Sequence, residues 1–411
     1  MIFYIVLSMS ISAFIFPSLL QEYSMMGLFS NRIPFAGFIF VIDELIALIG
    51  LLCSFFYLLY KGEISSKILK SPSTVMFFIY VAFSFALAYY ILPDNSRDLI
   101  LRNRWILINM CYFFIAFILY PKEKKIQSSV KLIVTLLFFI SVLKIFMFIF
   151  LRPSSSLYNV SPDFSFFISL SLLVILINSK NLMDRIAYFI CAFLIAFIST
   201  QLSAIVFFFI CVFFGSIATS SNQRLYLRYF KLTLLYSLAG YALISNISFL
   251  YQFIIESGFN ILFFSDAYIK IEQYLRIWTS AINSVINKNM LTGLGIGSEI
   301  EYIAPSFIFL GDQVFKLSLA HNIIVTIIHK FGLIGLILFF FSVREPLLIS
   351  SNRLGNNYLL LTIKFLIIAL FLNFLTTPGI WKIRKGVIFW LILGLYYYFK
   401  EKHDSNYQFS K

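Results

Sequence analysis

The chain has 411 residues, of which 61% are hydrophobic and only 12% are charged, and its formal net charge is +14. An ordinary soluble domain carries about 25% charged residues. Because no soluble core could enclose so much apolar surface, the composition excludes an ordinary soluble protein and predicts a single integral membrane domain over residues 1–411. Much of the positive charge lies in short segments between apolar stretches, where it sets membrane topology and does not indicate nucleic acid as a partner.

Long apolar segments recur along the chain. A transmembrane helix needs about 20 predominantly apolar residues. By this criterion the sequence predicts an all-α, polytopic membrane protein with about twelve transmembrane helices. They are expected at residues 1–20, 36–60, 75–92, 105–120, 132–151, 164–178, 186–200, 203–219, 232–249, 322–341, 358–375 and 387–399.

The lysines and arginines between these segments indicate how the chain is oriented. They are more numerous in one set of loops, which includes Lys122, Lys124 and Lys125, than in the opposite set. The positive-inside rule then predicts that both termini are cytoplasmic and that residues 250–320 form one long external loop. The polar tail, residues 400–411, is expected to be disordered.

Charged and cysteine side chains within or beside the spans have simple interpretations. Lys144 and Lys364 are expected to snorkel to a membrane interface. Asp43 and Glu44 are expected to pair with an outer arginine. The four cysteines lie inside apolar segments without the spacing of a metal site, so we expect neither a disulfide framework nor a bound metal.

Two short external loops are unusually basic. The first, residues 93–104, holds Arg97, Arg102 and Arg104, and residues 376–386 hold Lys382, Arg384 and Lys385. One interpretation is contact between interfacial side chains and lipid headgroups. The other is a basic rim that attracts a pyrophosphate group. The sequence leaves both open.

Residues 269–286 of the long loop predict an amphipathic helix. Their apolar residues recur at spacings of three and four, as on one face of an α-helix. These residues are Ile271, Leu275, Trp278, Ile282, Val285 and Ile286. Such a helix lies flat on the membrane surface, with Arg276 near the plane of the lipid headgroups. A guanidinium group stays charged and offers a planar fork to phosphate oxygens, although a surface arginine without function has the same pattern.

A glycine-rich turn follows that helix. Gly293, Gly295 and Gly297 invite comparison with a dinucleotide-binding loop, but no βαβ unit surrounds them. Their spacing instead indicates a turn at which the backbone approaches a substrate or a packed helix closely.

His321 and Asn322 stand at the start of the next apolar segment, for which Ser318 is the expected helix cap. A histidine here can titrate near neutrality and accept a proton from an attacking hydroxyl group. It can equally make a structural hydrogen bond only, and Glu299, Glu301 or Asp312 can serve as the base instead. Gly332 and Gly335 follow on one helix face, where a neighbouring helix can approach.

These residues together resemble the bacterial O-antigen polymerase and O-antigen ligase superfamily, whose members have ten to twelve spans and one large external loop. The ligase pattern of histidine, a small polar residue, nine residues and Gly-x-x-Gly is matched by His321, Asn322, Gly332 and Gly335. The Arg276-Ile277-Trp278 entry and the Gly-x-Gly turn resemble the polymerase branch more. The motifs cover about 60 residues, and the layout of the spans extends the likeness along the chain.

The resemblance implies an inverting, metal-independent glycosyltransferase of lipopolysaccharide biosynthesis, in the bacterial inner membrane and without a cofactor. The donor would be an oligosaccharide linked to undecaprenyl pyrophosphate, with membrane lipids and a chain-length regulator protein as further partners. Arg276 would bind the pyrophosphate group, and His321 would act as the base or orient the acceptor. Gly293, Gly295 and Asn322 belong to the expected substrate-binding set.

One departure from the family pattern concerns a second cation. Many members carry an arginine at the outer turn between the seventh and eighth spans, where this chain has Ser203. A second phosphate-binding cation must then come from elsewhere. The candidates are Arg97, Arg102, Arg104 and Arg152.

Three functions fit the sequence to different degrees. A polysaccharide polymerase is favoured, and a ligase that transfers the finished glycan to lipid A-core is the alternative within the family. A flippase for lipid-linked oligosaccharides is the alternative of another class. A flippase should show two similar halves and short outer loops, whereas residues 250–320 make this chain asymmetric.

Overall fold

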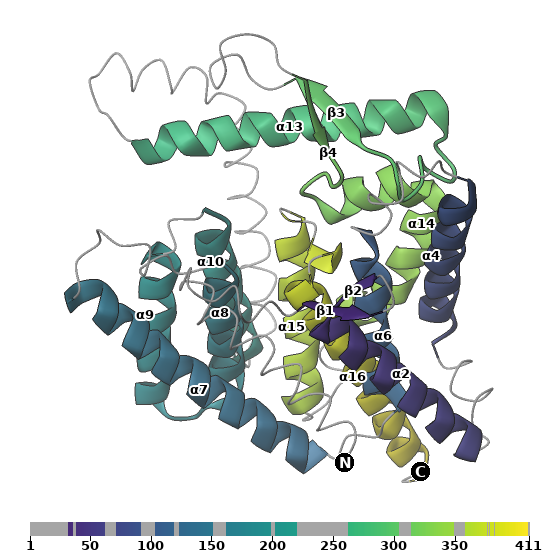
Figure 1. The fold of residues 1–411 in the computed structure, drawn as a ribbon. Coiled ribbons are helices and arrows are strands. Elements are labelled where there is room, and N and C mark those ends of the chain that lie inside the picture. The colour runs from purple at the N-terminus through teal and green to yellow at the C-terminus, as the bar shows by residue number, and fades with distance from the viewer. Residues whose placement is uncertain are drawn as a thin grey trace.

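The structure is a computed structural model that describes residues 32–35, 38–61, 71–91, 103–118, 123–150, 162–198, 202–219, 262–303, 314–348, 358–375, 377, 379–381 and 383–409. Within these residues the chain is mostly helical, as Figure 1 shows. The predicted spans 1–20 and 232–249, and the candidate residues Arg97, Arg102 and Arg152, lie outside them.

Each predicted span that falls within the described residues contains a helix, although in the span predicted at residues 36–60 the residues 38–41 form a strand. The helices are α2 (Ile42–Lys61), α4 (Pro72–Ile91), α6 (Trp105–Ile118), α7 (Glu123–Phe150), α8 (Pro162–Asn178), α9 (Leu182–Ile198), α10 (Leu202–Thr219), α13 (Leu262–Lys288), α14 (Ile323–Leu348), α15 (Tyr358–Phe374) and α16 (Ile383–Phe409), with the 3-10 helix η5 at Gly379–Trp381.

Several of these helices have the length and apolar composition of membrane-spanning helices. Three stretches are long and apolar enough to cross one, namely Pro72–Tyr90, Ile126–Leu143 and Ile323–Leu348. Other apolar helices, among them α6 and α15, are shorter. The described residues therefore support transmembrane character and do not establish the predicted number of spans.

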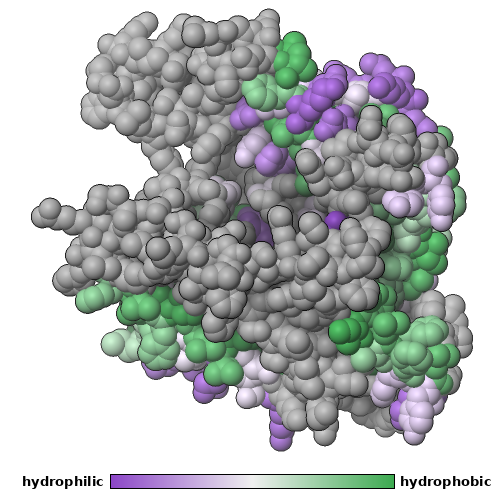
Figure 2. All heavy atoms as spheres, viewed as in Figure 1, coloured by the Kyte–Doolittle hydropathy of each residue, from purple (hydrophilic) through white to green (hydrophobic). Residues whose placement is uncertain are grey.

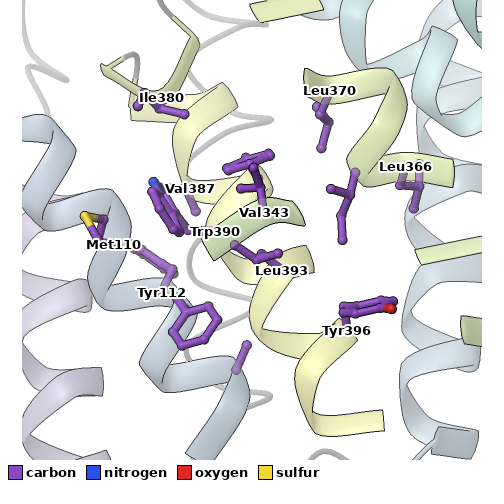
Figure 3. Packing of buried hydrophobic residues seen from close by; sticks show 14 of the residues in the cluster. Met110, Tyr112, Val343, Leu366, Leu370, Ile380, Val387, Trp390, Leu393 and Tyr396 are labelled. Atoms are coloured by element: carbon purple, nitrogen blue, oxygen red, sulfur yellow. The ribbon is translucent and has the colours of Figure 1, made fainter. Parts of the chain in front are cut away.

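The largest hydrophobic core forms around α16. In Figure 3 Trp390 and Leu393 of α16 lie between Tyr112 of α6 on one side and Leu366 and Leu370 of α15 on the other. A second core joins α7, α8, α9 and α10. Apolar packing across these two cores joins the helices.

Two antiparallel hairpins correct the prediction of an all-helical chain. β1 (Arg32–Phe35) pairs with β2 (Phe38–Val41), and β3 (Ile300–Ile303) pairs with β4 (Val314–Leu317). Each strand has four residues, too few for an alternating pattern to distinguish a strand from a loop in the sequence.

The long loop forms a layer of its own. α13, longer than the predicted helix at residues 269–286, lies across one end of the helices, and the β3–β4 hairpin packs against it (Figure 1). Figure 2 shows hydrophilic residues gathered at this end of the molecule and hydrophobic residues along the sides below. Residues 269–286 are therefore helical, as predicted, within the longer α13.

α14 departs from a regular span because it is broken. Gly332 has φ 64° and ψ −163°, which no α-helix contains, so two helical pieces meet there. The second piece, residues 333–348, would be about 24 Å long at 1.5 Å per residue, short of the ~30 Å hydrocarbon core of a bilayer. The predicted span at residues 322–341 is therefore not one straight helix.

Three smaller expectations are wrong. The tail is not disordered throughout, since α16 continues to Phe409. Lys364 does not snorkel to a surface: it is buried, with its Nζ 5.8 Å from the centre of the Phe365 ring. Lys385, expected in an exposed basic loop that contacts lipid headgroups or attracts a pyrophosphate, is also buried, with its Nζ 4.5 Å from the centre of the Phe166 ring.

Candidate functional site

The glycine turn after α13 inserts into the break of α14. We call residues 289–298 the insertion loop. In an unbroken helix the amides of Leu333 and Ile334 would donate to the carbonyls of His329 and Lys330. Here those two amides donate to insertion-loop carbonyls, at 3.0 Å to Met290 and 3.1 Å to Leu291.

The carbonyls on the other side of the break are also satisfied by the insertion loop. The amide of Leu294 donates to His329 at 2.8 Å, and the amide of Gly295 donates to Lys330 at 3.1 Å. Four bonds between loop and helix thus replace the two that the break removes. An unpaired backbone group in an apolar environment costs several kcal/mol, so this exchange makes the break tolerable.

Two glycines permit this close contact. A Cβ atom on Gly293 would lie 2.5 Å from the nitrogen of Gly332, and one on Gly332 would lie 2.2 Å from the carbonyl oxygen of Leu291. Gly332 was expected to admit a neighbouring helix, but it admits the insertion loop. Gly335 does face a helix, because its Cβ would lie 3.4 Å from the Tyr80 ring of α4.

His321 lies between the hairpin and α14 in a strained conformation. Its φ is 55°, the left-handed region that costs a non-glycine residue about 1–3 kcal/mol. The preceding residue, Ala320, is held on both sides: its carbonyl accepts from Trp278 Nε1 at 2.7 Å, and its amide donates to Thr326 Oγ1 at 3.1 Å. The His321 ring stacks on Tyr274 with 5.3 Å between the ring centres.

Asn322, rather than the expected Ser318, caps α14. Its Oδ1 accepts from the amides of Ile324 at 2.8 Å and Val325 at 3.2 Å, as a residue at the cap position does. Its Nδ2 donates to the carbonyl of Leu375 at 2.7 Å, after α15. Asn322 therefore joins residues 320–322, which we call the histidine segment, to α14 and to the end of α15.

Arg276 points to a different side of α13 from the histidine segment. Tyr274 and Arg276 are two residues apart, so their side chains leave the helix about 200° apart. Arg276 Nη2 lies 2.7 Å from Glu272 Oε1 in a partly exposed ion pair. Within the Arg-x-Trp motif, it is Trp278 that reaches the histidine segment.

α13 has three distinct sides. One packs on the hairpin and α14, one exposes apolar side chains, and one exposes polar side chains. The packed side includes Ile277, Ala281 and Val285. The exposed apolar side includes Leu275, Ile282 and Ile286, and the exposed polar side includes Arg276, Asn283 and Asn287. Such a helix suits a boundary where protein, lipid and water meet.

Of the four candidate arginines, Arg104 is the one that the structure describes. The neighbouring Asn103 is buried, and its Nδ2 donates to the carbonyl of Ile296 at 3.1 Å. This bond places the start of α6 beside the insertion loop. The Arg104 guanidinium lies 5.6 Å from the centre of the Trp105 ring. Ser203 lies in the first turn of α10.

Electrostatics bear on one of the candidate bases, Glu301. Glu301 is exposed, and its hydrogen bond with Lys316, 2.8 Å long, lowers the pKa of its carboxyl group. A lowered pKa makes a weaker base. Burial raises the pKa of Tyr274, so its hydroxyl stays protonated beside His321. Asp312 lies outside the described residues.

The fold brings two residues to this site to which the sequence assigned no role there, Asn103 and Lys330. Asn103 gave no signal, because an asparagine in a loop is ordinary. Lys330 is a lysine within an apolar segment, which marks a functional position more often than chance. It is fully buried beside the insertion loop.

Comparison with known proteins finds no protein-family model that matches the chain and no curated protein with significant sequence similarity to it. The site is therefore interpreted from its own residues.

The two glycines of the insertion loop provide a matched test of the close contact. Gly293 and Gly295 both have positive φ, 73° and 86°, but a Cβ on Gly295 would meet nothing within 4 Å. We expect Gly295→Ala to cost only the backbone strain, about 1–2 kcal/mol. Gly293→Ala should cost clearly more, since the added carbon collides with the backbone of α14. Thermal unfolding of the purified variants measures both, and equal losses would contradict the insertion geometry.

Proposed function

We propose that the protein is an O-antigen (surface polysaccharide) polymerase, a glycosyltransferase that joins repeat units linked to undecaprenyl pyrophosphate at the outer face of the bacterial inner membrane. The observation that carries the proposal is His321, a histidine in a strained left-handed conformation at the start of a broken apolar helix. Backbone strain of this kind concentrates at functional sites, because structure that serves packing alone relaxes it.

In the proposed reaction His321 accepts the proton of a sugar hydroxyl on one lipid-linked unit. The hydroxyl oxygen attacks the anomeric carbon of the second unit, and the bond from that carbon to the pyrophosphate oxygen breaks. The pyrophosphate leaves with the electron pair, still attached to its lipid, and the anomeric configuration inverts. The hydrogen bonds on both sides of Ala320 and the Tyr274 ring would hold the imidazole in place for this transfer.

The surroundings of α13 support a lipid-linked substrate. An undecaprenyl chain lies among the membrane lipids while its pyrophosphate group lies at the headgroups. The exposed apolar side of α13 suits the first environment, and its polar side, with Arg276, suits the second. Arg104 follows Asn103, whose side chain bonds the insertion loop, and would supply a further cation in place of the arginine that Ser203 replaces.

The test of the function is a surface-glycan gel from the source strain with the gene deleted and then restored. A polymerase should leave core carrying one repeat unit and no ladder, and the restored gene should return the ladder. An unchanged ladder in the deletion strain would overturn the proposal.

His321 is the residue whose substitution should stop the reaction. We expect His321→Ala to reduce polymer at least a hundredfold, since general base catalysis contributes about 10²–10⁴-fold. Polymer is quantified on the same gel, at matched amounts of protein in the membrane. His403→Ala, which removes a histidine near the end of α16, is the control and should make normal polymer. Wild-type polymer from His321→Ala would remove His321 from the mechanism.

Arg276 and its partner test the binding of pyrophosphate. Their ion pair contributes only about 0.3–0.5 kcal/mol, so an anionic substrate can displace Glu272. Arg276→Ala should abolish polymer, whereas Glu272→Gln should retain it and lower the KM for the lipid-linked donor in membrane vesicles. If Arg276→Ala and Glu272→Gln behave alike, the guanidinium acts only as a structural partner.

A ligase remains the second candidate because of the spacing from His321 and Asn322 to Gly332 and Gly335. The same gel separates it. A deletion strain lacking a ligase would carry core with no repeat unit while long lipid-linked polymer accumulates in the inner membrane.

A further inference from the structure

A buried lysine lies in the break of α14. Lys330 is 1% exposed, and its Nζ donates to the carbonyls of Ile296, at 3.1 Å, and Ser298. Asn103 Nδ2 also donates to the carbonyl of Ile296. The insertion loop thus turns two carbonyl groups toward one ammonium group.

The charge of this ammonium group is balanced by backbone dipoles. No carboxylate of the described residues lies within ion-pair distance of Lys330. Burying an ammonium ion costs several kcal/mol even after relaxation, and oriented carbonyl groups offset part of that cost. Carbonyl oxygens of an unwound segment in a broken helix are also the groups that coordinate small cations in membrane proteins.

The carbonyls that Lys330 holds lead directly to the histidine segment. Ser298 is two residues before β3, and Ile300 of β3 is buried in a small core with Ile277, Ala320 and Val325. Trp278 packs against this core and donates to the carbonyl of Ala320. A shift of the insertion loop therefore moves Ile300, and the close packing of the core transmits the shift to Ala320.

We propose that Lys330 is a positioning residue that, by holding the carbonyls of Ile296 and Ser298, sets the position of His321. The break is also closed by the four backbone bonds to the insertion loop, by the hydroxyl of Tyr80, which donates to the carbonyl of Phe331 at 3.0 Å, and by a 3.4 Å contact between Ser298 Oγ and His329 Nδ1. Lys330 adds hydrogen bonds from α14 to the carbonyls of Ile296 and Ser298, in the segment that leads into β3 of the hairpin (Figure 1). The role of His321 as the base rests on the proposed function, but its position does not.

The indole groups of the chain offer a direct measurement of that position. The sequence has four tryptophans. Trp278 Nε1 donates to the carbonyl of Ala320, whereas Trp390 Nε1 is buried without a hydrogen-bond partner among the described residues. In the indole region of an ¹⁵N–¹H spectrum of the purified protein, Trp390 supplies the position of an unbonded indole. Trp278→Phe assigns the signal of Trp278.

Lys330→Met keeps most of the side-chain volume but loses the charge and the donors. We expect it to move the Trp278 signal toward the position of an unbonded indole while the Trp390 signal stays in place. Lys330→Gln, which keeps two N–H donors, should give a smaller shift in the same direction. Lys364→Met removes another buried lysine, in α15, and should leave the Trp278 signal unchanged.

Two outcomes decide the inference. An unmoved Trp278 signal in folded Lys330→Met would overturn it. If Lys330→Met fails to fold, so that the Trp390 signal is lost as well, Asn103→Ala decides: it removes the other donor to Ile296 and should shift Trp278 less but in the same direction. No shift in Asn103→Ala would then overturn the inference. If the deletion and restoration of the wild-type gene leave the surface glycan unchanged while Lys330→Met still shifts the Trp278 signal, the positioning role stands and only the proposed function is rejected.

Discussion

The structure around His321 depends on one constraint, the need to pair every backbone polar group where water is scarce. At Gly332 the helix α14 loses two of its own hydrogen bonds, and the insertion loop restores them with four. This exchange works only because Gly293 and Gly332 carry no side chains. The free amides and carbonyls at the break hold the insertion loop in place, and the loop in turn satisfies those groups.

Three segments far apart in the sequence meet at this point. The insertion loop follows α13, Asn103 precedes α6, and Lys330 lies within α14 itself. From the loop, β3 and β4 carry the chain back to Ala320, where Trp278 of α13 holds it. Contacts on both sides of His321 therefore fix its position. Because these contacts hold the neighbouring residues, the strained φ of His321 can persist.

This arrangement suits chemistry at a membrane surface better than passage through a pore. A long amphipathic helix, a hairpin and the start of a broken apolar helix together form a layer at one end of the helices. The proposed pyrophosphate ligand, Arg276, lies on the polar side of α13 rather than beside His321. The pyrophosphate is bonded to the anomeric carbon that the acceptor hydroxyl attacks, so Arg276 can serve the same reaction as His321 only if its side chain leaves Glu272 and turns toward His321.

The sequence by itself determined the helical character of the chain, the amphipathic helix in the long loop and the motifs around Arg276, Gly293 and His321. Those features follow from local composition and from the periodicity of apolar residues. Only the tertiary structure decided that Trp278 rather than Arg276 reaches the histidine segment, that Gly332 breaks α14, and that Lys330 and Asn103 converge on Ile296. These outcomes depend on hydrogen bonds between segments distant in sequence, and no local pattern encodes such partners.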